Sequence, residues 1–120
     1  MKTLAKVLIM LVRLIWLVEL GLGISLASAK GLAYVKLHIG LGFTLALLLF
    51  ILAMIGLVKR EIVPAILGII FAVLLPYIGL QQFPIKFGPA LGMIQYAHVV
   101  IVLLAIGVAE MLHAKIKRVS

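Results

Sequence analysis

The sequence contains four long apolar stretches separated by short polar or turn-rich segments, and this pattern constrains the fold more than any other feature. The stretches cover about residues 4–27, 35–58, 62–81 and 93–114. A helix needs about 20 apolar residues to cross the hydrocarbon core of a bilayer, and each stretch is long enough. Together they take up nearly the whole chain. We therefore predict an all-α, integral-membrane, up-down four-helix bundle that forms one domain over residues 1–120.

The amino-acid composition excludes most functions of soluble proteins. Hydrophobic residues make up 67% of the chain and charged residues 12%, whereas soluble proteins have about 25% charged residues. The short connections leave no space for a catalytic domain outside the membrane, so an electron-transfer or structural role is favoured over that of a stand-alone enzyme. The net charge of +8 does not indicate nucleic-acid binding, because the basic residues lie between the apolar stretches, where they set topology. The absence of cysteine excludes disulfides and thiolate-held iron–sulfur clusters.

The distribution of basic residues predicts the orientation. With the N-terminus inside, seven Lys and Arg residues lie at the inner ends of the stretches and three at the outer ends. Cytoplasmic segments carry the excess of Lys and Arg, so we predict that both termini face the cytoplasm of a prokaryotic cell, with the chain in its plasma membrane. The inner set is Lys2, Lys6, Lys59, Arg60, Lys115, Lys117 and Arg118, and the outer set is Lys30, Lys36 and Lys86.

Turn residues and prolines refine the expected helices. Pro84, Gly88, Pro89 and Gly92 predict an irregular connection before the fourth helix, and Pro76 predicts a kink in the third. A signal peptide is the alternative interpretation of the first stretch, since residues 27–29 form an A-x-A cleavage pattern. The charged residues within this stretch oppose that interpretation, because the apolar region of a signal peptide should be uncharged.

Two histidines within the apolar stretches are the strongest candidates for chemistry. His38 begins the second stretch, in the segment KLHIGLG, and His98 lies in the outer part of the fourth, in QYAHVV. Polar groups at membrane depth are costly, so each one is a functional hypothesis. The second and fourth helices of an up-down bundle are diagonal, and imidazoles from both sides can ligate a haem b iron. Gly42 lies on the same helical face as His38 and would give the macrocycle close access to the backbone.

In helix number and histidine placement, nearly the whole chain resembles the four-helix core of membrane b-type cytochromes, the cytochrome b561-like and cytochrome b bundles. The resemblance rests on His38 and His98, and implies that they are the axial ligands of a haem b. Those families usually carry four ligands and two haems. Here His113 is the only inner histidine, so the resemblance implies one haem in the outer leaflet. Bis-histidine ligation favours electron transfer, which we expect between the quinone pool and a partner on the outer side.

Each candidate residue also has an alternative role that does not involve haem. His38 near the outer boundary also fits an interfacial histidine facing lipid headgroups, and His98 fits a buried imidazole hydrogen-bonded to Glu19, Tyr96 or a backbone carbonyl. Lys36 would pair with a haem propionate or anchor the helix at the interface. The corresponding alternative for the protein is a haem-free accessory subunit of a larger, respiratory membrane complex, bound to other subunits or to further copies of itself.

The remaining charges within the stretches predict contacts between helices. Arg13 and Glu110 lie at similar depth on the first and fourth stretches, so we predict a buried ion pair that fixes these helices against each other, with a path for protons through Arg13, Glu19 and Glu110 as the alternative. Glu19 lies deeper. We predict that it accepts the Nδ1 proton of a metal-bound His98, or that it is itself protonated.

Overall fold

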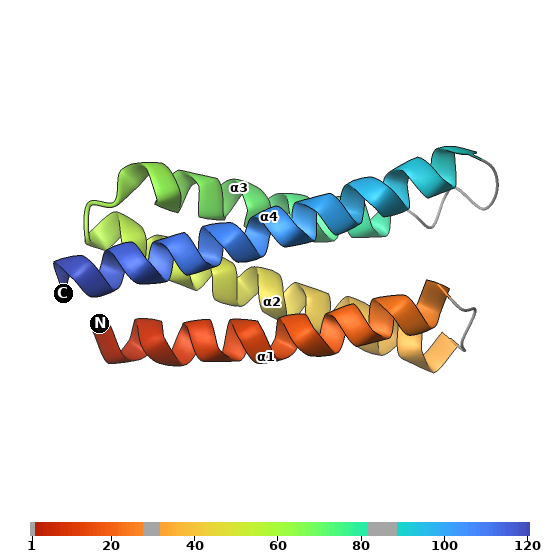
Figure 1. The fold of residues 1–120 in the computed structure, drawn as a ribbon, viewed down its shortest axis with the longest axis horizontal. Helices are drawn as coiled ribbons and strands as arrows, with labels where there is room; N and C mark the ends of the chain where they lie inside the picture. Colours follow the sequence, from red (N-terminus) through yellow and green to blue (C-terminus); the bar gives the residue numbers. More distant parts are fainter. Residues whose placement is uncertain (1, 28–31, 82–88) are drawn as a thin grey trace.

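The computed structural model describes residues 2–27, 32–81 and 89–120, which form four helices and no strand (Figure 1). The all-α prediction is therefore confirmed for these residues. Three of the helices contain segments that are long and apolar enough to cross a membrane, namely Val35–Val58, Ile62–Leu80 and Gly92–Val119. The helices are α1 (Lys2–Ala27), α2 (Leu32–Val58), α3 (Ile62–Leu80) and α4 (Pro89–Val119).

Consecutive helices run in opposite directions along the long axis, so that the N- and C-termini lie at the same end (Figure 1). In the described ranges α1 packs against α2 and α4, and α3 packs against the same two helices. Helices α2 and α4 also contact each other, whereas α1 and α3 do not. Toward the end away from the termini, α4 diverges from α1 (Figure 1). The diagonal pair α2 and α4, which carries the two candidate histidines, is therefore the one in contact.

A tight turn joins α2 to α3. Arg60 takes a left-handed conformation with φ of 63°, and the N–H of Glu61 donates to the carbonyl of Gly56 at 2.8 Å. This conformation satisfies carbonyls at the end of α2 that have no helical partner. Pro64 lies in the first turn of α3, where its missing N–H costs no hydrogen bond. The turn therefore places α2 and α3 side by side.

The packed core occupies only the half of the bundle that contains the termini. The distal half consists of residues 17–23, 35–44, 76–81 and 92–104, and Glu19 is the only buried residue among them. The apolar core lies entirely in the other half, which we call the terminal half. Its buried apolar residues are Ala5, Leu8, Ile9, Val12, Leu45, Ala46, Leu49, Leu52, Ala53, Ile55, Ala65, Ala72, Leu75, Ala105, Val108, Ala109, Leu112 and Ile116.

Two predictions about local structure require correction. Helix α4 begins at Pro89 and includes Gly92, although both were expected in the preceding connection. Proline suits a first helical turn, because its φ is already helical and no N–H partner is needed. The helix also continues past residue 114 to Val119, where Lys117 and Arg118 interact favourably with the helix dipole. Helix α3 continues through Pro76. Pro84, Gly88, Lys30 and Lys86 lie outside the described residues.

Candidate functional site

The structure brings His38 and His98 together in the distal half. Their ring centroids are 6.4 Å apart, and the ring planes are nearly perpendicular at 83°. His38 comes from α2 and His98 from α4, and both side chains are half-buried. The two residues are 60 positions apart in the sequence, and the contact between the diagonal helices is what makes them neighbours.

Glu19 of α1 completes this cluster, but beside a different histidine from the one predicted. Its Oε2 lies 3.2 Å from Nδ1 of His38, so the predicted contact with Nδ1 of His98 is wrong. The reason is the divergence of α4 from α1 in this half, which leaves α2 as the neighbour that Glu19 faces (Figure 1). The two atoms are near each other, but Nδ1 of His38 makes no hydrogen bond.

Three glycines lie against the polar groups of the site. A Cβ at Gly79 would stand 3.2 Å from Cε1 of His98, and one at Gly23 would stand 3.8 Å from Cε1 of His38. A Cβ at Gly42 would stand 3.2 Å from Oε2 of Glu19. Gly42 therefore gives space to the Glu19 carboxylate. Its predicted contact with a macrocycle does not follow from this geometry.

Several polar atoms here are buried without a hydrogen bond. They are Nδ1 of His38, Nδ1 of His98, Oε1 of Glu19 and Nε1 of Trp16. Most buried polar atoms in proteins have a hydrogen-bond partner, so the three exceptions at His38, His98 and Glu19 make this cluster a candidate functional site, whereas Trp16 lies in the terminal half. Trp16 also lines a cavity of about 10 Å³ below the histidines, which is room for about one water molecule. The predicted site residues do not include Trp16.

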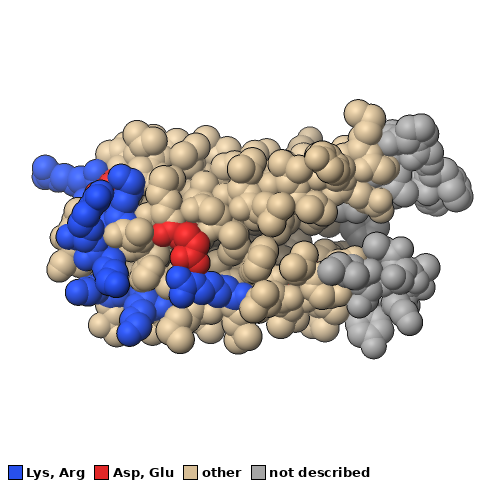
Figure 2. Space-filling model, in the orientation of Figure 1, with Lys and Arg blue, Asp and Glu red and all other residues tan. Residues whose placement is uncertain are grey.

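Arg13 and Glu110 form the predicted ion pair between α1 and α4, in the terminal half. Nε of Arg13 donates to Oε1 of Glu110 at 2.6 Å, and Nη2 donates to Oε2 at 2.8 Å. Their side chains are 53% and 41% exposed, so the pair is not buried as predicted. The two helices meet here at the edge of the bundle, where acidic and basic atoms adjoin on the surface (Figure 2).

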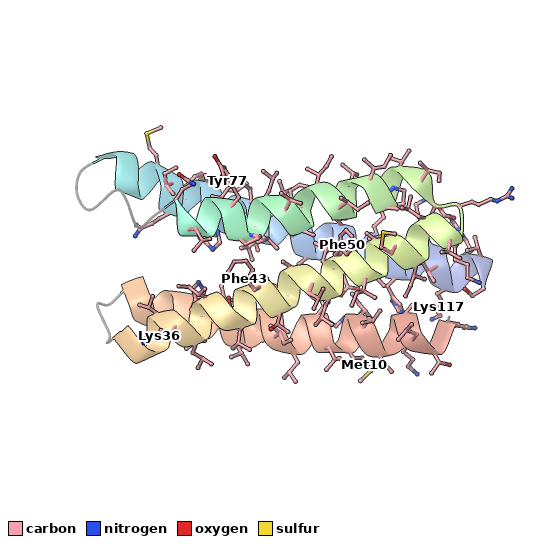
Figure 3. All side chains as sticks on the ribbon, turned by 180° about the vertical axis from the view of Figure 1, so that it is seen from behind. Met10, Lys36, Phe43, Phe50, Tyr77 and Lys117 are labelled. Atoms are coloured by element: carbon pink, nitrogen blue, oxygen red, sulfur yellow. The ribbon has the colours of Figure 1, made fainter. Side chains whose placement is uncertain are left out.

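The other candidates lie apart from the cluster. Lys36 is exposed near the distal end of α2, far from Lys117 at the opposite end of the molecule (Figure 3). His113 lies three residues after Glu110, in the terminal half. Within residues 2–27, 32–81 and 89–120, no three His, Asp or Glu side chains are placed to hold a metal ion together.

Comparison of the chain with protein-family models, with curated proteins and with solved structures found no match. The assignment of a function therefore depends on the geometry of the site.

Proposed function

We propose that the chain is an integral-membrane, up-down four-helix bundle that binds one haem b in its distal half and carries single electrons. The observation that supports this most directly is the pair of neighbouring imidazoles from α2 and α4, in edge-to-face contact, with a carboxylate near one of them. No apolar side chain is buried among residues 17–23, 35–44, 76–81 and 92–104, which adds to it. A site for a large flat group needs two ligands from different helices and few packed side chains between them.

The spacing of the histidines fits an iron held between them. Bonds from an imidazole nitrogen to a metal are about 2.0 Å, and the nitrogen lies about 1.1 Å from the ring centre, so two rings that pointed a nitrogen at one metal would have centroids about 6.2 Å apart. The observed separation is 6.4 Å. A porphyrin supplies four nitrogen ligands and needs only two from the protein, which agrees with a cluster that holds two histidines.

Each residue of the cluster has a distinct role in this proposal. His38 and His98 would hold the iron through their free ring nitrogens. Oε2 of Glu19 lies 3.2 Å from Nδ1 of His38 without a hydrogen bond between them. A hydrogen bond formed there on binding would favour the tautomer that carries its proton on Nδ1, and would leave Nε2 of His38 for the metal. Haem b supplies a one-electron couple when bound. If both histidines held the iron, no position would be left for oxygen, so the bound haem would supply electron transfer rather than oxygen activation.

The proposed orientation places this site toward the outer side of the membrane. Lys and Arg side chains gather at the end where the termini lie (Figure 2), and that end faces the cytoplasm if basic residues stay inside. Electrons would then pass between the quinone pool and a partner on the outer side. This position favours an electron carrier over a protein that moves electrons across the whole bilayer.

The test is an absorbance spectrum of the purified protein, expressed with adequate haem supply. We expect a b-type α-band after reduction with dithionite, and we expect His98→Ala to lose it. His113→Ala is the matched control, because that histidine lies in the terminal half, and it should keep the full band. A reduced spectrum without an α-band, or full haem occupancy in His98→Ala, would refute the proposal.

The second candidate function is a haem-free accessory subunit of a larger membrane complex. The half-exposed pair of Arg13 and Glu110 favours it, since charged side chains at membrane depth normally face protein or water. The same spectrum separates the two candidates, because an accessory subunit of this kind has no α-band.

A further inference from the structure

The pair of Arg13 and Glu110 is exposed at a depth where charged groups avoid lipid. Glu110 lies five residues before Lys115, which places it about 8 Å along α4 from the basic end of the helix. It also lies within the segment of α4 that is apolar enough to span a membrane. Charged side chains in such segments almost always face other protein groups or a water-filled cavity. The exposed surface around this pair is therefore a candidate contact surface.

We propose that a second copy of the chain docks on this surface to form a two-fold symmetric dimer. The surface, which we call the α1–α4 face, consists of Arg13, Leu17, Leu103, Gly107 and Glu110. Leu17 and Leu103 are 58% and 52% exposed, and nothing lies within 4 Å of a Cβ built on Gly107. The inference depends on the membrane location in the proposed function, but not on haem.

Charge complementarity favours a second copy over other occupants. A two-fold axis brings the same face of both copies together, so Arg13 of each copy can lie opposite Glu110 of the other. Within one chain the guanidinium uses only Nε and Nη2 toward Glu110, and an arginine has five N–H donors and a carboxylate about four acceptor positions. Each pair is neutral, so the two copies meet here without repulsion. The basic residues at the ends of the helices lie at headgroup level, where salt screens them.

Gly107 provides an independent argument for close contact. Leu103, Gly107 and Glu110 are spaced at i, i+4 and i+7, so they form one outward stripe on α4. Small residues at the centre of such stripes let two membrane helices approach closely, which strengthens van der Waals packing and hydrogen bonds between helices. Here the glycine lies three residues before the charged pair, so close approach also brings the polar groups of two copies within reach.

Disulfide formation tests the dimer directly, because the natural chain has no cysteine. Gly107→Cys should form a disulfide-linked dimer in liposomes at high lipid-to-protein ratio, as seen by non-reducing electrophoresis. The matched control is Val73→Cys on α3, at similar depth and 62% exposed. We expect the dimer fraction of Gly107→Cys to be about fivefold higher, the ratio for one favourable polar contact between membrane helices.

Charge variants in the Gly107→Cys background separate the ion pair from simple proximity. Arg13→Gln should lower the dimer fraction, whereas the double exchange Arg13→Glu with Glu110→Arg should restore it. Equal crosslinking at Gly107→Cys and Val73→Cys would overturn the proposal. Crosslinking of Gly107→Cys only to a different protein, in cell membranes and not in liposomes, would also overturn it. The haem spectrum of the same samples is independent of these results, so failure of the dimer is distinguishable from failure of the cytochrome proposal.

Discussion

Substitution of Gly68 by alanine tests how closely α3 packs in the terminal half. A Cβ at Gly68 would stand 2.9 Å from Cβ of Ala53 on α2 and 2.9 Å from Cδ1 of Leu112 on α4. Ala53 and Leu112 are both fully buried, with 0% exposure. The Cβ of Ala53 is fixed to its backbone and cannot rotate away. The added methyl group must therefore move α3 away from α2.

The size of the effect follows from these distances. Carbon atoms in favourable contact are about 3.5–4.0 Å apart, so the two atoms now at 2.9 Å must separate by about 0.6–1.1 Å. Overpacking of this kind costs about 1–3 kcal/mol. Alanine gains about 1 kcal/mol over glycine in helix propensity when the unfolded chain is not helical. In the proposed membrane protein the unfolded reference state keeps its helices, so this gain is small and the free energy of unfolding should fall by about 1–3 kcal/mol.

The assay is reversible unfolding in mixed micelles with increasing sodium dodecyl sulfate. Trp16 is the only tryptophan in the chain and lines the cavity beside the core, so its fluorescence reports the loss of packing. Gly40→Ala is the control, because nothing lies within 4 Å of a Cβ at that position. If Gly68→Ala and Gly40→Ala differ by less than about 0.5 kcal/mol, the spread of neutral surface substitutions, the reasoning about close packing is wrong.

The site supports two further predictions, both measured by haem titration of the purified apoprotein. Glu19→Gln should weaken haem binding about 10–100-fold, because it removes the carboxylate that orients a ligand. The control is Glu61→Gln at the other end of the bundle, which should bind haem as tightly as the natural chain. Equal haem affinities of the two variants would contradict the role of Glu19. Gly79→Ala should also weaken haem binding, since its Cβ would lie 3.2 Å from the ring of His98. The control is Gly21→Ala, which should leave haem binding unchanged because nothing lies within 4 Å of a Cβ at that position. A normal affinity in Gly79→Ala would show that the ring position is not critical.

The helices were predictable because apolar runs and charged gaps determine where a chain of this composition turns. The start of α4 was not predictable, because a proline is common both in connections and in the first turn of a helix. Pro89 lies in the first turn of α4. The meeting of His38 with His98 followed from depth and from the diagonal placement of their helices. The contact of Glu19 with His38 could not be predicted from the sequence, because it depends on the rotation of α1 about its axis and on the divergence of α4 from α1. Those properties come from packing, which a single sequence does not display.

The uneven distribution of packing between the two halves also affects which substitutions this chain can accept in evolution. Its stability resides in the terminal half, where the apolar side chains of all four helices are buried, while the candidate ligands lie in the distal half. Local opening requires little free energy where few apolar contacts are broken, so the distal half can open while the terminal half stays folded. Substitutions near the histidines therefore have a small effect on whether the protein folds. New chemistry can evolve at one end of the bundle because the other end is sufficient to hold it together.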